Sequence, residues 1–333
     1  MTDGTIEAAG TSVLLMLNND QRDRAAGVLL GAACGDALGV PYEFAEPLPE
    51  TAVPEMVGGG LGPYAPGEYS DDTQMQVCVA EVAATAGDLR SEEALDGIAE
   101  RFLRWSHEGA SDVGLQTSGV LAATARAGGL ARSMREASAD LHRKTGRTAG
   151  NGSLMRTGIV ALPYLADPAG MAEAARLVSS LTHFDDLAGD ACVLWCSGVR
   201  RAVLDATFDG VREGLDLLPA ERRHHWAAWL RDAETGPPGR FSPNGFVVPA
   251  LQAAWSAITH TANLTGGLVA AVRVGNDTDT VAAIAGALLG ARYGLSAVPD
   301  EWRARVHGWP GLRADDLVSL ARRAAEPTAG RVR

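Results

Sequence analysis

The sequence is poor in several kinds of residue, and each shortage excludes a class of protein. Aromatic residues make up 5% of the 333 residues, and Lys144 is the only lysine. The 29 basic residues are outnumbered by 41 acidic ones, which gives a net charge of −12. A broad basic face for a nucleic-acid backbone is therefore not expected. A single phosphate compound is still an acceptable ligand, because a helix N-terminus or a bound metal can hold it.

Long apolar runs and a cysteine framework are also missing. No apolar run approaches the roughly 18 residues of a membrane span, and the best candidate, 281–291, fits a buried core helix. The first ten residues, MTDGTIEAAG, lack the basic flank of a signal peptide, so we expect a cytoplasmic protein. Cys34, Cys78, Cys192 and Cys196 lie in apolar stretches without a complete zinc ligand set, which predicts buried free thiols.

Helical periodicity dominates the chain, of which 46% is apolar. The segments that place apolar residues at helical spacing, rich in Ala and Leu, are 24–38, 73–86, 91–105, 115–127, 171–181, 187–204, 250–260 and 280–293. The only short β-like run is 245–248. We therefore predict a compact all-α fold.

Two irregular stretches rich in Gly and Pro interrupt this pattern, at 44–69 and 232–249. Such long loops often form lids or line pockets. The first is the better lid candidate because it precedes the most acidic motif. Without an internal repeat or a clear linker, we predict one domain over residues 21–325. Residues 1–20 and 326–333 are expected to be flexible ends, and the protein to be a monomer.

The first acidic motif is Ser70-Asp71-Asp72-Thr73, placed between a Gly/Pro loop and a helical run. One interpretation is an N-cap, because Ser and Asp side chains accept hydrogen bonds from free N–H groups at a helix start. Capping explains one such residue. It leaves two adjacent carboxylates that repel each other unless a cation lies between them.

A second cluster, Asn276-Asp277-Thr278-Asp279-Thr280, also follows a glycine and opens an apolar helix. Each cluster alone is compatible with either a cap or a metal site. Two oxygen-rich clusters at two helix starts together favour hard cations such as Mg²⁺ or Mn²⁺.

Three weaker features accompany these clusters. In GDALGVPYEF, the glycines indicate close helix packing, Asp36 is expected to be a structural hydrogen-bond acceptor, and Glu43 is a candidate functional carboxylate on a loop. In GNGSLMR, the glycines of Gly150-Asn151-Gly152-Ser153 allow a backbone to approach a ligand closely, although a plain turn is the simpler interpretation. Asp112 and His183 belong to short polar motifs that, taken singly, are compatible with caps or satisfied polar contacts.

In content and order, the motifs GDALGVPYEF, GEYSDDTQM, SDVG, GNGSLMR, THFDD and VGNDTDTVAAIAG resemble the ADP-ribosylglycohydrolase family. The likeness covers about residues 24–295, and the branch that activates dinitrogenase reductase is the most similar. The resemblance implies an all-α domain with two divalent cations, Mg²⁺ or Mn²⁺. It also implies removal of ADP-ribose from a modified protein or small acceptor.

The resemblance assigns roles by position in this chain. Its implied metal ligands are Ser70, Asp71, Asp72, Asp277, Asp279 and Thr280. Its implied ADP-ribose contacts are Asp112, Gly150, Asn151, Gly152, Ser153 and His183. One of Glu43, Asp71 and Asp72 is expected to take a proton from water. The family more often has Thr at the position of Ser70, and both residues offer one hydroxyl oxygen.

Several alternatives stay open from the sequence. The acceptor is expected to be arginine, with serine-linked ADP-ribose, O-acetyl-ADP-ribose or a nucleobase adduct as other choices. A relative that binds ADP-ribose without turnover is a second alternative, although the principal carboxylates are present. A Mg²⁺-dependent isoprenoid-diphosphate enzyme is a remote one, because its first motif needs a further carboxylate where this chain has Thr73-Gln74-Met75-Gln76.

Overall fold

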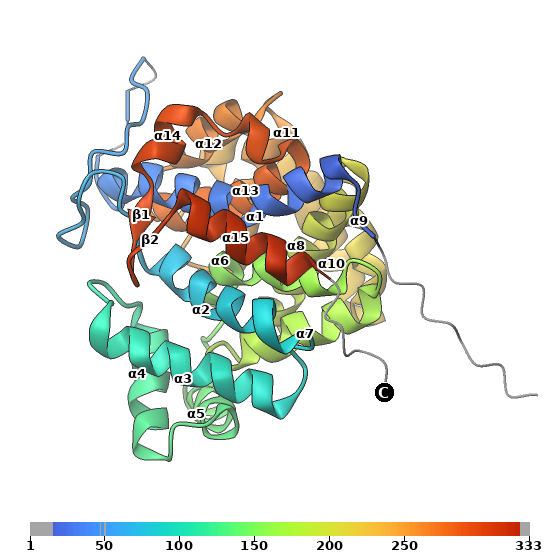
Figure 1. Cartoon of the computed structure of the whole chain (residues 1–333). Coiled ribbons are helices and arrows are strands. Elements are labelled where there is room, and N and C mark those ends of the chain that lie inside the picture. The colour runs from blue at the N-terminus through green and yellow to red at the C-terminus, as the bar shows by residue number, and fades with distance from the viewer. Residues whose placement is uncertain (1–15, 47, 50, 327–333) are drawn as a thin grey trace, which may run out of the picture.

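The structure, a computed structural model, describes residues 16–326 except 47 and 50 (Figure 1). Its secondary structure confirms the all-α prediction. The α-helices are α1 (Asn19–Gly39), α2 (Asp71–Ala86), α3 (Glu92–Glu108), α4 (Leu115–Arg126), α5 (Ala131–Thr145), α6 (Leu154–Thr157), α7 (Pro168–Ser180), α8 (Asp186–Asp205), α9 (Gly210–Glu213), α10 (Ala220–Thr235), α11 (Val247–Thr259), α12 (Leu264–Val272), α13 (Thr278–Tyr293), α14 (Asp300–Arg305) and α15 (Ala314–Ala325).

Short elements complete the chain. The 3₁₀ turns are Val40–Tyr42, Asn151–Ser153, Gly158–Tyr164, Gly214–Leu217, Pro238–Arg240 and Leu295–Ala297. In the described part of the chain, the only named strands are β1 (His307–Gly308) and β2 (Leu312–Arg313), which pair antiparallel. Helices α3, α4 and α5 lie together at one end of the molecule, away from α14 and β1 (Figure 1).

The central feature of the fold is the close antiparallel contact between α1 and α13. The face of α1 that touches α13 carries glycines spaced four residues apart, Gly27, Gly31, Gly35 and Gly39. A Cβ atom on Gly31 would lie 2.3 Å from the backbone oxygen of Gly286, and one on Gly39 would lie 2.3 Å from the Cα of Asp279. Only glycine permits this approach. As a result, the C-terminal end of α1 lies against the N-terminal end of α13, where the acidic residues are.

By length and composition, the helical segment Asn19–Tyr42 is apolar enough to cross a membrane, with a mean hydropathy of 1.3 over an 18-residue window. This corrects the expectation that 281–291 is the best such candidate. Within the protein 89% of that window is buried, mainly against α13, α15 and α8. A helix that is buried in a protein core and apolar on every side meets the same criterion of length and composition.

Some helices were not predicted from the sequence. Helix α10 is one, because only Trp226, Leu230 and Ala233 of its 16 residues are buried and the apolar signal is weak. Helices α5, α12 and α15 are others. The prediction of a β-like run at 245–248 was wrong, since Val247 opens α11. Tertiary packing overrides the β-branched preference there.

The boundaries of the irregular and terminal segments also shift. Helix α10 continues to Thr235, inside the stretch predicted to be irregular from residue 232. Helix α1 begins at Asn19, and the Asn18 side chain caps it by accepting a hydrogen bond from the Gln21 backbone N–H. The first residues of this helix therefore lie within residues 1–20, which were predicted to be flexible. The predicted flexible residues 1–15 and 327–333 lie outside the described residues. All four cysteines are buried and free, as predicted.

Candidate active site

Helix α2 begins at the first acidic motif, but the motif does not cap it. Ser70 occupies the N-cap position without a side-chain capping hydrogen bond. The carboxylate of Asp36, from α1, accepts the backbone N–H groups of Ser70 at 2.8 Å and Thr73 at 2.9 Å instead. The structural role predicted for Asp36 is therefore confirmed. Capping of α2 therefore does not account for Asp71 and Asp72.

Helix α13 begins in a similar way. Asp277 is its N-cap residue and makes no side-chain capping bond. The Asp277 carboxylate accepts a hydrogen bond from Asn151 Nδ2 at 2.7 Å, and its backbone N–H donates to Asn244 Oδ1 at 3.1 Å. Asn244 also donates to the carbonyl of Gly275 at 3.0 Å. These contacts join the glycine loop to the second acidic motif.

The acidic side chains from both helix starts and the loop after α1 converge. One carboxylate oxygen from each of Asp36, Asp72 and Asp279 lies within 4.8 Å of the others, and the same holds for Glu43, Asp277 and Asp279. Asp279 belongs to both groups. The Ser70 hydroxyl lies 3.0 Å from Asp72 Oδ2 and 3.3 Å from Asp279 Oδ2.

The electrostatics of this cluster are unfavourable without a counter-charge. Burial first, and neighbouring carboxylates second, raise the pKa of Asp71, Asp72 and Asp279 well above the ordinary value. The same causes raise the pKa of Glu43 to about 8. Burial also raises the pKa of Asp277, against the hydrogen bond from Asn151. Carboxylates crowded in this way need a cation or protons to share the site.

The residues present fit divalent cations. Asp72 Oδ1 and Asp277 Oδ1 are buried and have no hydrogen-bond partner among the described residues. All the converging ligand atoms are hard oxygens, the donors that Mg²⁺ and Mn²⁺ prefer. The hydroxyl of Thr280 lies beside Asp72 and Asp277 and lowers the pKa of both. Two groups of three carboxylates with one shared member are suited to two neighbouring cations.

The glycine loop is packed against His183. A Cβ atom on Gly150 would lie 3.2 Å from His183 Nε2, and one on Gly152 would lie 3.1 Å from His183 Cε1. A methyl group at either position would crowd the imidazole ring, and neither glycine has a positive φ angle, so the close packing of the ring is the structural reason for glycine here. The His183 side chain is 3% exposed, so it supports the loop from within.

Two other residues that the resemblance assigns to the ligand lie in different settings. Ser153 is fully buried and its hydroxyl accepts a hydrogen bond from Ser179 at 3.0 Å, so its side chain faces the core. Asp112 is partly exposed, and its charge helps to raise the pKa of Glu43 and Asp71. Asp112 therefore lies within electrostatic range of the carboxylate cluster.

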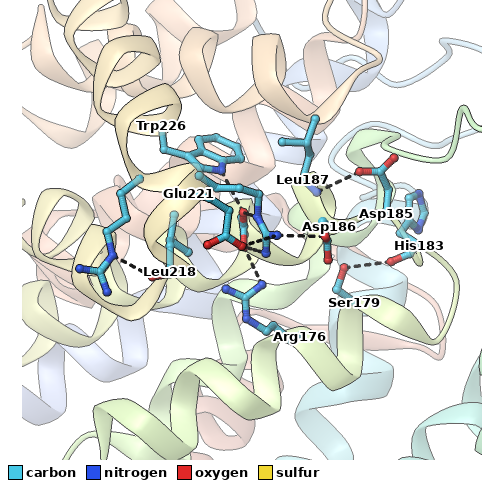
Figure 2. A network of polar contacts seen from close by, with 12 residues as sticks. Arg176, Ser179, His183, Asp185, Asp186, Leu187, Leu218, Glu221 and Trp226 are labelled. Carbon is cyan, nitrogen blue, oxygen red and sulfur yellow. Dashed lines mark hydrogen bonds and ion pairs between the residues drawn. The ribbon is translucent and has the colours of Figure 1, made fainter.

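The THFDD motif continues into a structural network on α8 (Figure 2). Asp185 caps α8 by accepting the Leu187 backbone N–H at 2.9 Å. One turn further, the fully buried Asp190 accepts hydrogen bonds from Arg176 at 2.6 Å, Arg222 at 2.5 Å and Trp226 at 3.2 Å. This network ties α7 and α10 to α8. Because His183 lies between the end of α7 and the start of α8, the network holds the helices on both sides of this residue.

Sequence reasoning missed Asn244, which is fully buried and joins Asp277 to Gly275. The only available signal was the position of Asn244 in an irregular stretch. Its function as a bridge depends on how that stretch folds back onto α13.

Comparison with known proteins shows the family to which the chain is similar. A sequence model of the family described as ADP-ribosylglycohydrolase matches residues 17–332. A protein named ADP-ribosylarginine hydrolase Tri1, from Pseudomonas putida, is 32% identical over 287 residues, which cover 85% of this chain and 74% of that protein. The ADP-ribosyl-[dinitrogen reductase] glycohydrolase of Rhodospirillum rubrum is 29% identical, with 85% and 90% covered.

A more distant relative and a solved structure also match most of the chain. Human ADP-ribosylhydrolase ARH3 is 25% identical, and the alignment covers 85% of this chain and 89% of that protein. A solved structure described as an ADP-ribosylglycohydrolase-related protein complex superposes with a TM-score of 0.68 at 28% identity. That match covers 92% of this chain and 99% of the other. This chain therefore belongs to the ADP-ribosylglycohydrolase family, a family of enzymes that hydrolyse glycosidic bonds.

Proposed function

We propose that this protein removes ADP-ribose from a modified arginine by hydrolysing the bond at the anomeric carbon of the ribose, with two divalent cations bound. The observation that carries the proposal is the convergence of five carboxylates, which form two groups of three that share Asp279. The arginine acceptor is supported by the 32% identity to an ADP-ribosylarginine hydrolase.

Asp72, Asp277 and Asp279 are the side chains that would hold the cations, with the Ser70 and Thr280 hydroxyls beside them. Asp36 belongs to the same group of oxygens, but both of its oxygens already accept backbone N–H groups. Bound Mg²⁺ or Mn²⁺ supplies Lewis-acid polarisation of water and a fixed place for the vicinal hydroxyls of the ribose.

Glu43 is the group we assign to proton transfer. It follows the 3₁₀ turn at the end of α1 and is partly exposed, whereas Asp72 and Asp279 are buried. Water can reach its carboxylate, which lies beside Asp277 and Asp279. Taking a proton from the attacking water there is ordinary general-base catalysis. The surrounding carboxylates also stabilise positive charge on the ribose as the bond breaks.

The test is release of free ADP-ribose from an arginine-ADP-ribosylated peptide, measured with Mg²⁺, with Mn²⁺ and with EDTA. We expect metal-dependent release that Asp279→Asn abolishes. Glu43→Gln should lower kcat by about 10²–10⁴ and should weaken metal binding less than Asp279→Asn does, because Glu43 belongs to one group of carboxylates and Asp279 to both. If EDTA leaves the rate unchanged, the role of cations in this proposal is wrong.

The ARH3 relatives, at 25% identity, are named ADP-ribosylhydrolases without a stated acceptor, so a different acceptor on the same ADP-ribose site is the second candidate. Serine-linked ADP-ribose and O-acetyl-ADP-ribose are the substrates to compare in parallel. If either is hydrolysed while the arginine conjugate is not, the acceptor is reassigned and the cation site is retained.

A further inference from the structure

Arg156, on α6, is a fully buried arginine in the GNGSLMR motif to which neither the resemblance nor the proposed function gives a role. Its guanidinium donates to the Gly152 carbonyl at 2.8 Å, the Thr182 hydroxyl at 2.8 Å and the Val178 carbonyl at 3.4 Å. It also lies over the ring of Phe102, 4.8 Å from the centroid. Buried charges are usually paired. Among the described residues, the hydrogen-bond partners of this one are all neutral.

The direction of the hydrogen bonds follows from the chemistry of the donors. A guanidinium has N–H donors and no acceptor, so the Thr182 oxygen accepts from Arg156. The Thr182 hydroxyl proton then needs an acceptor of its own. In the described part of the chain, the acceptor within reach is His183 Nδ1 at 2.8 Å. Donation from the Thr182 hydroxyl to Nδ1 is the arrangement that leaves the hydroxyl proton paired, and it requires a lone pair on Nδ1.

The other ring nitrogen of His183 must then hold the proton. Burial, and the charge of Arg156 after it, lower the pKa of His183 well below its ordinary value, so the ring is neutral. A neutral ring without a proton on Nδ1 has one on Nε2. That nitrogen faces the glycine loop, 3.2 Å from the position of a Cβ on Gly150. No hydrogen-bond acceptor for it is found among the residues that the structure describes.

We propose that Arg156 and Thr182 are positioning residues that hold His183 in the tautomer protonated at Nε2, so that its N–H donates to an oxygen of ADP-ribose at the glycine loop. The opposite tautomer would turn a lone pair toward that oxygen and repel it. Arg156 also holds the Gly152 carbonyl, so one side chain fixes both the loop and the ring packed against it. The identity of the ligand as ADP-ribose rests on the proposed function. The tautomer of His183 is argued from the hydrogen bonds of this protein alone.

The tautomer is measured directly by ¹⁵N NMR of the imidazole nitrogens in the full-length, histidine-labelled protein without metal or ligand. The chain has seven histidines, and the signals lost in His183→Gln identify the ring. We expect a protonated Nε2 and an unprotonated Nδ1 in the wild type. A proton on Nδ1, or on both nitrogens at neutral pH, would overturn the proposal.

Variants of Thr182 test the relay. Thr182→Val removes the hydroxyl at nearly the same volume, and we expect the proton to redistribute toward Nδ1. Thr182→Ser restores the hydroxyl and should restore the wild-type tautomer. Thr124→Val is the matched control, because Thr124 is an equally buried threonine whose hydroxyl donates to the Val120 carbonyl of its own helix. An unchanged tautomer in folded Thr182→Val would contradict the proposal.

Binding of ADP-ribose, followed by calorimetry, tests the consequence for the ligand. We expect Kd to rise about tenfold in Thr182→Val and to stay unchanged in Thr182→Ser and Thr124→Val. A changed tautomer with unchanged affinity would overturn the contact between Nε2 and the ligand. If the wild type binds no ADP-ribose, the proposed function and this contact fail together, and the NMR measurement alone decides on the relay.

Discussion

Asp279 contributes an oxygen to both groups of carboxylates, so both proposed cation positions would depend on this one side chain. We expect Asp279→Asn to weaken Mn²⁺ binding by about 100-fold or more. The same substitution removes a buried acid that repels its neighbours, so Tm of the metal-free protein should rise by about 2–4 °C. Calorimetry measures Mn²⁺ binding, and thermal unfolding in EDTA measures Tm of the metal-free protein. Asp140→Asn, at an exposed carboxylate on α5 paired with Lys144, is the control and should change neither.

The raised pKa of Glu43 determines in which direction stability changes with pH. The pKa of Glu in an unfolded chain is about 4.3, whereas the pKa of Glu43 in the folded, metal-free protein is raised to about 8. Between these values the folded state binds more protons, so the free energy of unfolding falls as pH rises. Urea unfolding in EDTA at several pH values from 5 to about 8 should show this fall, and Glu43→Gln should reduce its slope. A slope that is the same in both proteins would show that Glu43 titrates normally.

At the scale of elements, the contact between α1 and α13 is the most sensitive to added volume. In Gly31→Ala the new methyl group would overlap the Gly286 carbonyl, which belongs to backbone and cannot rotate away. We expect a loss of about 3 kcal/mol in the free energy of unfolding. Gly119→Ala is the matched control, because Gly119 lies in α4 with nothing within 4 Å of a Cβ. That change should stabilise the protein by about 0.5–1 kcal/mol. Chemical denaturation of both variants makes the comparison.

Elements with a strong apolar period were predictable from the sequence, and so was the surplus of carboxylates at the starts of α2 and α13. Capping accounts for one polar residue at a helix start, so the excess of Asp indicated another function. Helix α10 was not predictable, because most of its surface is exposed and it buries one narrow side. The bridge made by Asn244 and the inward direction of Ser153 depend on tertiary contacts. Local sequence patterns carry no information about them.

For the whole molecule, cation binding should be visible as added stability. A ligand that binds only the folded state stabilises it by about 2.7 kcal/mol at 100 times its Kd. We expect Mg²⁺ and Mn²⁺ each to raise Tm by several degrees, and EDTA to reverse the effect. The rise should be absent in Asp279→Asn and retained in Glu43→Gln if Asp72, Asp277 and Asp279 suffice to hold the ions. An equal rise in wild type and Asp279→Asn would place the ions elsewhere.

The contact between α1 and α13 also sets the order of events during synthesis on the ribosome. The Thr278 hydroxyl bonds the Gly39 carbonyl at 2.8 Å, although the two residues are 239 positions apart. At translation rates of about 5–20 residues per second, roughly 10–50 s separate the emergence of these two residues. Throughout that interval the nascent chain carries an apolar helix whose main partner has not been made. An apolar helix exposed in this way is the kind of segment that chaperones bind, and the acidic centre can assemble only after Asp277 and Asp279 at the start of α13 have been made.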